Sequence, residues 1–581
     1  MQQSQPKRTD RRSFLKGAAL VGAGAAATGL VAACTPSSPG EGTSTTPAPT
    51  GGGETAPTTG WSWATPPEPI ADADISETIE TEIAVVGAGI SGCAAACRAS
   101  QLGAKVVVVE KQGWPSSRGG HYGGYQTKAM TREGLTNDPM DQIASEWLRF
   151  EGNRAKQKII YRYLERSGEV IDWLEDYSKE FAEGGLIVAP IITHYVGPYY
   201  YEHIGTHVIF GPGSMMEGQG YPANENMINA PVYFMWKQAE AKGAQFLFNT
   251  PAEQLVQDSS GKVTGVVAKK EDGSYVKINA SKGVLLASGD FSGDEEMREA
   301  YCDPISLKCD SFSYTPPGAN TGDGQKMAMW AGAHMFLGEH CSPSMMHLIR
   351  YAMLCFGFMY VNTSGRRFMN EDTWIQAKSI RILQQPGDNS FAYSVFDGDY
   401  QQQVIDSLQY GGGQFWDNMS HMVGQPFDWG TPEDPFSPAG MMAAGLENGT
   451  VFQADTIADL AAQIGVEAAV LQEEVDKYNQ WYDSGVDGDY HKRVELLTPI
   501  RTAPFYAVKF GPSNLVHPNG VEVNEAMQVL DEKLDPIPGL YASGNASGGR
   551  YGVDYPVVMN GNSHGSAMTF GYLVGEDLAN A

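Results

Sequence analysis

The sequence has 581 residues, of which 42% are hydrophobic and 19% charged, a balance typical of a globular chain with about two or three domains. Its 40 Lys and Arg residues are outnumbered by 68 Asp and Glu residues, giving a formal net charge of −28 at pH 7. Such an acidic surface repels nucleic acids, so we expect no nucleic-acid partner; it suits a basic partner protein or serves solubility alone.

Residues 1–33 have the pattern of an export signal. Arg11 and Arg12 are followed by Ser-Phe-Leu-Lys, which is a twin-arginine motif, and an apolar stretch rich in Ala and Gly runs from Gly17 to Ala33. This stretch is marginal in length for a permanent membrane span. We therefore expect a protein that is exported in its folded state and works outside the cytoplasm.

The end of the signal resembles a bacterial lipobox, Leu30 to Cys34, so cleavage before Cys34 would leave a lipid-anchored N-terminus. The alternative is cleavage near an Ala-x-Ala site and a freely soluble product. Residues 35–60 are almost all Thr, Ser, Pro, Gly and Ala, a composition that cannot bury enough apolar area to fold. We assign 34–78 to a disordered tether.

A dinucleotide-binding unit begins directly after the tether. The buried-strand pattern Glu82–Val86 leads into a G-x-G-x-x-G turn and a helix of small residues, and a second strand, Lys105–Val109, ends at an acid. Such a turn admits a pyrophosphate at the helix N-terminus, and the acid accepts the adenosine ribose hydroxyls. The residues expected to hold the nucleotide are Gly87, Ala88, Gly89, Ser91, Gly92 and Glu110.

Later motifs favour FAD over NAD. In chain order they are residues 109–124, 285–291, 321–328, 361–371, 537–545 and 567–571. From about residue 80 to 577 the chain thus resembles the succinate dehydrogenase/fumarate reductase flavoprotein family, whose cofactor is FAD. The resemblance implies an α/β fold: a Rossmann-like FAD-binding domain with an inserted α+β capping domain.

The resemblance also implies boundaries and a place for the substrate. The FAD-binding domain would comprise residues 79–304 and 498–581, and the capping domain residues 305–497. The substrate would lie at their junction, against the flavin ring, where closure of the cap excludes water.

Further flavin contacts follow from the family. They are Lys111, Ser116, Ser117, Gly123, Gly124, Ala252, Ser288, Gly289, Asp323, Asn545, Ser563 and His564. Ser563 and His564 begin the last helix, whose backbone N–H groups would stabilise negative charge on reduced flavin. Ser117 stands where succinate dehydrogenases bond a histidine to FAD, so we expect non-covalent FAD. His121, close by, is expected to be a pocket or core residue.

The residues that grip a dicarboxylate in fumarate reductases are absent. The two histidines of the family fall on Ser342 and near Val516, and the proton-donating arginine falls on Ile375. The clamping arginine falls on Tyr555 or Val558. Because burying a dianion without these cations is costly, we expect neither fumarate nor succinate as the substrate.

The end of the chain is more similar to the 3-ketosteroid dehydrogenases. The similarity lies in Asn545, in the dipeptide Tyr555-Pro556 and in the helix Ala567–Leu573. In that branch the tyrosine donates a hydrogen bond to the substrate ketone, so Tyr555 is the leading catalytic candidate. The alternative is a tyrosine that only packs against the flavin. Tyr551 and Tyr122 are weaker acid/base candidates.

Two other groups leave alternatives open. An aromatic cluster lines a pocket for a flat apolar substrate or packs a loop: His194, Tyr195, Tyr199, Tyr200, Tyr201 and His203. Four cysteines match no ferredoxin spacing, which favours buried thiols over an iron–sulfur cluster: Cys302, Cys309, Cys341 and Cys355. We expect no other metal site.

These patterns together predict an exported FAD-dependent oxidoreductase that reduces a C=C bond conjugated to a carbonyl in a small organic acceptor. A tyrosine or water would supply the second proton. Electrons would come from a membrane-bound cytochrome or quinol-oxidising partner, because no NADH pool exists outside the cytoplasm. The alternatives are a 3-ketosteroid-type dehydrogenase running in the reverse direction and a flavin electron-transfer protein.

Overall fold

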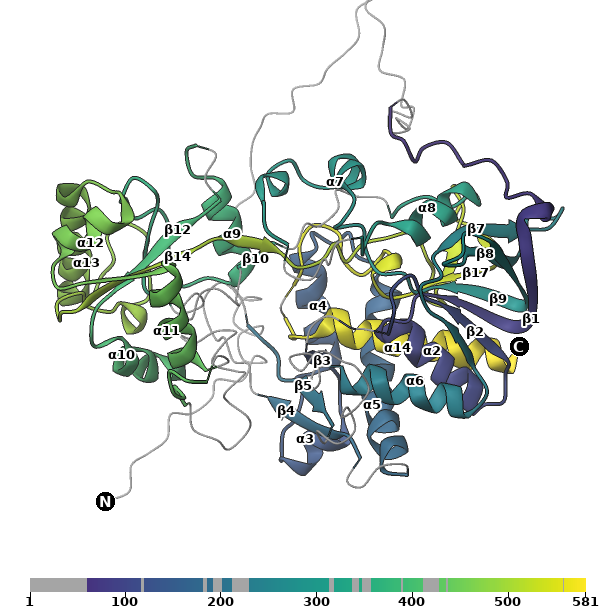
Figure 1. Ribbon diagram of the computed structural model, residues 1–581. Coiled ribbons are helices and arrows are strands. Elements are labelled where there is room, and N and C mark those ends of the chain that lie inside the picture. Colours follow the sequence, from purple (N-terminus) through teal and green to yellow (C-terminus); the bar gives the residue numbers. More distant parts are fainter. Residues whose placement is uncertain are drawn as a thin grey trace, which may run out of the picture. The chain divides into compact units, whose positions relative to one another are not determined.

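The computed structural model describes residues 60–115, 117, 120–180, 185–191, 201–211, 229–312, 318–336, 344–346, 357–387, 390–410, 428–434, 437–556 and 558–581. Residues Thr59–Ala581 form one compact unit (Figure 1). Among the described helices, none combines the length and the apolar character that a membrane span requires. Several expectations fall outside the described residues: those on 1–59, Ser116, His194, Tyr195, Tyr199, Tyr200, Cys341, Ser342, Cys355 and the side chain of Ile375.

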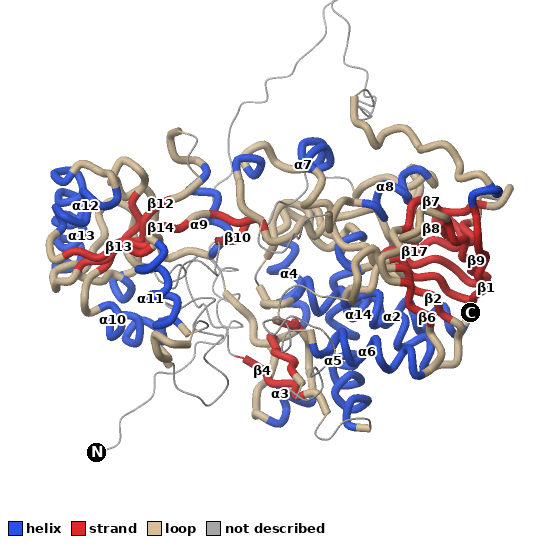
Figure 2. Tube along the Cα trace, in the orientation of Figure 1, coloured by secondary structure: helices blue, strands red, loops and turns tan. Residues whose placement is uncertain are grey.

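The largest sheet has eight strands and confirms the two strands expected around the glycine-rich turn (Figures 1 and 2). Its path runs β16-β17-β9-β1-β2-β6, and β8 pairs with β9 and with β7. The four residues of β2 are buried valines, the apolar run typical of a parallel strand covered on both faces. The strands are β1 (Ile75–Val86), β2 (Val106–Val109), β6 (Gln245–Leu247), β7 (Ala252–Gln257), β8 (Val263–Lys269), β9 (Tyr275–Leu286), β16 (Gln528–Leu530) and β17 (Pro536–Ala542).

Two helices from opposite ends of the chain, α2 (Ile90–Gln101) and α14 (Asn562–Asn580), pack side by side. A Cβ atom at Gly571 would lie 2.2 Å from the carbonyl oxygen of Ser91, so only glycine allows this approach. The helix after the glycine-rich turn, α2, and the last helix of the chain, α14, therefore lie next to each other beside the sheet (Figure 1).

A smaller group of elements lies near the start of α14. The three-stranded sheet β3-β5-β4 contacts this helix through β3. Its elements and the helices around it are β3 (His121–Gly123), β4 (Ile187–Ile191), β5 (Thr206–Phe210), α3 (Lys128–Arg132), α4 (Met140–Phe150), α5 (Gln157–Lys179) and α6 (Ala230–Ala241).

The inserted cap has its own sheet and its own core. The sheet runs β11-β12-β14-β13, and α12 and α13 pack on it. Its elements are β11 (Met359–Val361), α9 (Ile375–Leu383), β12 (Ala392–Phe396), α10 (Tyr400–Ser407), α11 (Pro438–Asn448), β13 (Val451–Ala454), α12 (Ile457–Ile464), α13 (Ala468–Ser484) and β14 (Phe505–Phe510). A separate pair joins β10 (Ser344–Met346) to β15 (Pro512–Asn514).

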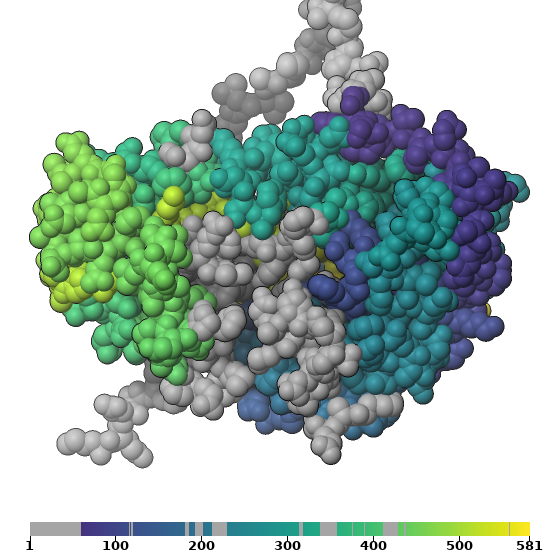
Figure 3. Space-filling model, in the orientation of Figure 1, coloured from purple at the N-terminus to yellow at the C-terminus, as the bar shows by residue number. Residues whose placement is uncertain are grey.

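Two boundaries expected from the sequence need correction. The cap does not end at residue 497, because β14 pairs with β12 and β13 of the cap sheet. The expected tether, 34–78, does not extend to residue 78, because β1 begins at Ile75 and Trp63 stacks on Tyr301 with ring centroids 5.6 Å apart. Tryptophan supplies the apolar area that the preceding residues lack. In the space-filling view, the segment that precedes β1 is purple and lies on the teal surface (Figure 3).

Candidate active site

The glycine-rich turn between β1 and α2 has the shape that a phosphate-binding turn needs. Gly87 has a φ of +103°, and a Cβ atom there would lie 2.5 Å from the carbonyl oxygen of Ala287. A Cβ atom at Gly92 would lie 1.9 Å from the carbonyl oxygen of Gly87. Gly89 is the N-cap of α2 and has no side chain to cover the first N–H groups of the helix. These groups are therefore available to a pyrophosphate.

Glu110 lies where the sequence placed it, beside this turn. Its Oε2 accepts a hydrogen bond from the backbone N–H of Ala88 at 2.7 Å, and its Oε1 accepts one from Gln112 at 2.8 Å. Burial raises the pKa of Glu110, while these hydrogen bonds oppose the shift. Each carboxyl oxygen still has a lone pair with which it can accept a ribose hydroxyl.

Lys111 and Asp323 are brought together, although one follows β2 and the other begins α8 (Asp323–Trp330). The Lys111 ammonium donates to Asp323 Oδ2 at 2.9 Å and to Thr321 Oγ1 at 2.7 Å. Both residues are thus placed at one site, but each already neutralises the other. Ala252, another expected contact, begins β7.

The turn after β9 presents a hydroxyl group suited to a ligand. Ser288 Oγ is buried and has no hydrogen-bond partner within the described part of the chain. Gly289 follows with a φ of +81°, and a Cβ atom at Gly324 would lie 2.1 Å from Ser288 Oγ. A buried unpaired hydroxyl costs free energy unless something fills the site, so this turn fits the polar edge of a bound cofactor.

The start of α14 gathers seven of the expected residues. Ser117 Oγ is hydrogen-bonded to His564 Nε2, and Ser563 Oγ donates to Asn545 Oδ1 at 3.3 Å. The ring of Tyr122 stacks on His564 with centroids 4.4 Å apart. Burial lowers the pKa of His564 to about 4, so its imidazole is neutral at pH 7. Gly123 and Gly124 continue this wall in and after β3; a Cβ atom at Gly123 would lie 3.1 Å from the Asn562 backbone.

The three tyrosines proposed for catalysis have different surroundings. Tyr555 Oη accepts a hydrogen bond from the backbone N–H of Ser563 at 3.4 Å, which places the phenol at the N-terminus of α14. Tyr551 is fully buried and donates to Asn562 Oδ1 at 2.6 Å, which favours a structural role. Tyr122 Oη is buried without a partner among the described residues, so Tyr122 remains a candidate.

Several residues near this site were missed by sequence reasoning. Gln376 of α9 donates from Nε2 to the Tyr555 carbonyl oxygen at 3.1 Å, directly after the Ile375 position. His517, one residue after Val516, is buried; its backbone N–H donates to Asp290 Oδ2 at 3.0 Å and its ring stacks on Phe291. A shift of one residue in the motif comparison would have found His517. For Gln376 the sequence held no signal.

A buried guanidinium group was also missed. Arg550 is 1% exposed and donates to Ser566 Oγ and to the Gly544 carbonyl oxygen, both at 2.5 Å. These donors therefore bind groups of the protein itself. Val558, one of the two positions expected for the clamping arginine of fumarate reductases, is buried and apolar.

Of the aromatic cluster, Tyr201 and His203 are described. The ring nitrogens of His203 lie 2.8 Å from Asp138 Oδ2 and 3.0 Å from Glu146 Oε2, so this histidine packs against carboxylates. Cys302 and Cys309 are buried thiols. In the described ranges, no group of three or more His, Cys, Asp or Glu side chains could hold a metal ion.

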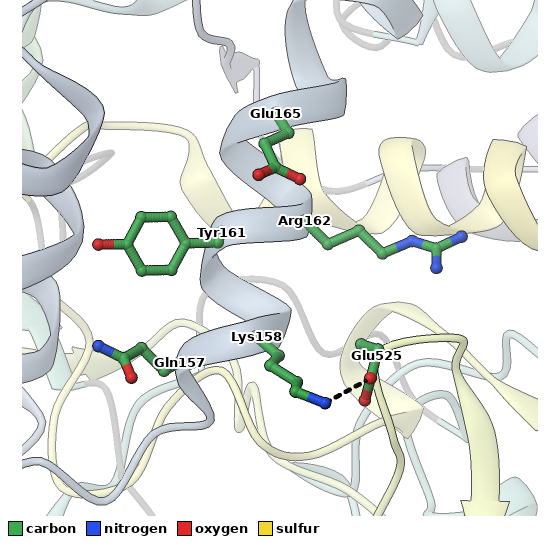
Figure 4. A pocket seen from close by; sticks show the side chains of 6 residues that line it. All are labelled: Gln157, Lys158, Tyr161, Arg162, Glu165 and Glu525. Atoms are coloured by element: carbon green, nitrogen blue, oxygen red, sulfur yellow. Dashed lines mark hydrogen bonds and ion pairs between the residues drawn. The ribbon is translucent and has the colours of Figure 1, made fainter.

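A surface pocket of about 460 Å³ lies elsewhere, on α5 (Figure 4). Lys158 in this pocket pairs with Glu525 at 2.9 Å, and Arg162 pairs with Asp577 at 3.2 Å. Since both cations already have acidic partners, we assign no function to it.

The fold and the turns described above define an FAD-dependent oxidoreductase: the glycines, Glu110 and the unpartnered Ser288 hydroxyl fit an adenine dinucleotide, and the helix N-termini fit its charges. The chain belongs to the family described as FAD binding domain, whose model matches residues 82–562.

Individual relatives agree with this assignment. Digoxin reductase of Eggerthella lenta is 26% identical over 578 residues, which cover 93% of this chain and 91% of that protein. The fumarate reductase (cytochrome) of Shewanella frigidimarina is 25% identical and covers 86% of this chain and 77% of its own. The solved 3-ketosteroid Δ1-dehydrogenase of Sterolibacterium denitrificans, in complex with 1,4-androstadiene-3,17-dione, has a TM-score of 0.67 at 22% identity, covers 86% and 99% of the two chains, and shows the shared fold.

Proposed function

We propose that this protein reduces a C=C bond conjugated to a carbonyl group in a small organic acceptor. The observation that carries the proposal is the Tyr555 phenol at the N-terminus of α14, 3.4 Å from the Ser563 N–H. Bound FAD supplies the hydride in its reduced form. The names of a digoxin reductase and a ketosteroid dehydrogenase among similar proteins support a ring-bearing enone or enoate as the substrate.

Tyr555 would act on the carbonyl oxygen rather than on the carbon that receives hydride. As the double bond is reduced, negative charge grows on that oxygen. A phenol donor beside a helix N-terminus stabilises this charge more strongly in the transition state than in the ground state. The proton for the neighbouring carbon would come from Tyr122, whose hydroxyl has no partner in the described residues, or from water.

A dicarboxylate is disfavoured at this site. Val558 and Ile375 stand at positions expected for the two arginines of fumarate reductases, and two N–H groups of Arg550 donate to Ser566 and Gly544. The histidine next to an expected position is the buried His517. Removing two negative charges from water without counter-charges costs more than a neutral carbonyl costs. The proposed acceptor therefore carries a carbonyl and an apolar body.

We further propose that FAD is held without a covalent bond, because Ser117 replaces the bonding histidine. We propose a flavin-binding domain of residues 60–304 and 515–581 and a cap of residues 305–514. We also propose export by the twin-arginine route, a lipid anchor on Cys34 and electron delivery by a membrane-bound cytochrome or quinol-oxidising protein. The motif Arg11-Arg12, the lipobox and the absence of a second nucleotide motif in the sequence support this location.

The direct test uses the holoenzyme, chemically reduced under anaerobic conditions and mixed with a panel of cyclic enones, enoates, steroids and fumarate. Reoxidation of the flavin by enones but not by fumarate is the expected result. If saturated 3-ketosteroids instead reduce the oxidised flavin faster than enones reoxidise it, the protein is a dehydrogenase. If no compound acts in either direction, it is an electron-transfer protein.

A further inference from the structure

The loop that carries Tyr555 is held in place by hydrogen bonds and ring contacts from the end of α4. The indole Nε1 of Trp147 donates to the carbonyl oxygen of Arg550 at 3.0 Å, and its ring stacks on Tyr551 with centroids 5.7 Å apart. Just after α4, the Lys156 N–H donates to the Gly549 carbonyl oxygen at 2.6 Å. Residues 549–551 are thus fixed from one side.

Glu151, the C-cap residue of α4, also binds this loop through its side chain. One carboxyl oxygen, Oε2, accepts hydrogen bonds from three consecutive backbone N–H groups: that of Gly552, that of Val553 at 2.9 Å and that of Asp554 at 3.5 Å. Tyr555 is the next residue, so the carboxyl group sets the backbone that places the phenol.

The second carboxyl oxygen has unusual surroundings. Glu151 is 0% exposed, and its Oε1 has no hydrogen-bond partner among the residues that the structure describes. A buried carboxylate oxygen without a partner is costly, whereas a protonated one is not charged. Burial disfavours the charged form of this carboxyl group, whereas the three N–H groups at Oε2 favour it.

An ionisable neighbour also disfavours the charged form. Asp554 on the loop is the acid whose charge acts on Glu151. Burial is the largest cause and raises the pKa of Glu151 to about 8; the hydrogen bonds from the Gly552 and Val553 N–H groups oppose this shift, and the Asp554 charge adds to it. Burial also raises the pKa of Asp554 to about 6.

We propose that Glu151 is the positioning residue of Tyr555, and that its carboxyl group holds residues 552–554 in the conformation that points the phenol at the substrate carbonyl. This inference rests on the proposed role of Tyr555. It assigns no direct contact between Glu151 and substrate. It does predict that Glu151 and Tyr555 act through one backbone segment.

The test compares Glu151→Gln with Glu151→Ala in the holoenzyme. The amide of Gln keeps the shape and an acceptor oxygen for the three N–H groups, so kcat at pH 7 should stay near the wild-type value. Ala removes the acceptor, so kcat should fall about 10²-fold with a smaller change in KM. Glu175→Gln is the matched control. Glu175 is also buried, but it lies on α5 and pairs with Arg132 of α3.

Two readouts do not need turnover. Amide hydrogen exchange of residues 549–556 should speed up in Glu151→Ala and stay unchanged in Glu151→Gln. The folded state holds a proton on Glu151 that the unfolded state releases above about pH 4.5, so wild-type stability should fall from pH 5 to 8 relative to Glu151→Gln.

Each result either supports or contradicts the positioning role of Glu151. A Gln variant as impaired as the Ala variant would mean that the charge is needed, and an Ala variant with normal kcat and exchange would remove the positioning role. If Glu151→Ala does not fold, the Gln variant still decides through its kcat, its hydrogen exchange and its relative stability. If no substrate is turned over even by wild type, the proposed function fails, while the exchange and stability measurements still test Glu151.

Discussion

Replacing Tyr555 by phenylalanine removes one oxygen atom and keeps the ring that stacks on Tyr551 at 5.3 Å. Because the lost hydrogen bond matters most when the carbonyl oxygen bears charge, kcat should fall by about 10²–10³, with a smaller change in KM. Steady-state kinetics with an enone identified in the reoxidation panel measure both constants. The bound flavin spectrum should not change.

Tyr551→Phe is the matched control. It removes the hydrogen bond to Asn562 Oδ1 and should cost about 1 kcal/mol of stability, with little effect on kcat. Equal losses of kcat in the two variants would mean that the aromatic stack, rather than the Tyr555 hydroxyl, is what catalysis requires.

How far the site could be predicted depends on how local each contact is. The arrangement of Gly87 to Glu110 follows from local sequence, because one strand, one turn and one helix determine their geometry, while their contacts to FAD stay predictions. Glu151 and Gln376 were not found, because their partners lie 401 and 179 residues away in the sequence. A single sequence carries no signal that links Glu151 to residues 552–554, because the carboxyl group binds only backbone N–H groups, which every residue type except proline has.

At the scale of elements, the contact between α2 and α14 sets the distance between the two helix N-termini of the site. A methyl group at Gly571 would meet the Ser91 carbonyl oxygen at 2.2 Å and push the helices apart. Gly571→Ala should therefore destabilise the protein by about 1–3 kcal/mol and lower the FAD content of the purified protein. Asp577→Ala, which affects only the surface pair with Arg162, should change neither quantity. Normal FAD content in Gly571→Ala would show that the site tolerates a shift of α14.

The cap contains a buried ion network that ties the turn after β11 to the loop after α13. Arg367 contacts Glu371 at 2.8 Å and Asp487 at 2.8 Å, and its side chain is 2% exposed. Arg367→Met leaves two buried carboxylates without their main partner and should cost about 3–5 kcal/mol. Arg366 offers the comparison: its half-exposed side chain pairs with the exposed Glu473 and with the buried Glu474, which also contacts Lys477, so Arg366→Met should cost less than Arg367→Met. Denaturant unfolding compares the two, and equal losses would argue against the network.

This network also has a pH dependence with a definite sign. Burial opposes ionisation of Asp487, but the hydrogen bonds and charge of Arg367 outweigh it and lower the pKa of Asp487 to about 2. Its stabilising contribution is therefore complete above about pH 4 and is lost as the pH falls toward 2. Unfolding measured between pH 5 and 2 should show this loss in the wild type and not in Arg367→Met.

At the scale of the whole molecule, the proposal that FAD is held without a covalent bond rests on one position in the sequence. Ser117 cannot form the bond that a histidine would form, and burial lowers the pKa of nearby His121 to about 4. Acid precipitation should release all of the flavin into the supernatant, where absorbance identifies it as FAD. Flavin that stays with the precipitate would contradict this and would point to His121 as the bonded residue.

The fold of the molecule was predictable because its motifs are spread along most of the chain. The end of the cap was not, since β14 joins the cap sheet from residues next to the flavin-binding part and carries no motif of its own. The end of the tether was misjudged because composition, which describes a window of residues, does not register a single anchoring side chain such as Trp63.

The central claim is that the protein reduces a conjugated C=C bond and leaves the carbonyl group intact. A single anaerobic turnover of the chemically reduced holoenzyme with a cyclic enone, followed by mass spectrometry of the product, tests it most directly. The account predicts one saturated ketone formed per flavin oxidised, and a loss of this product in Tyr555→Phe at early times. An allylic alcohol as the product, or fumarate reduced in place of every enone, would contradict it.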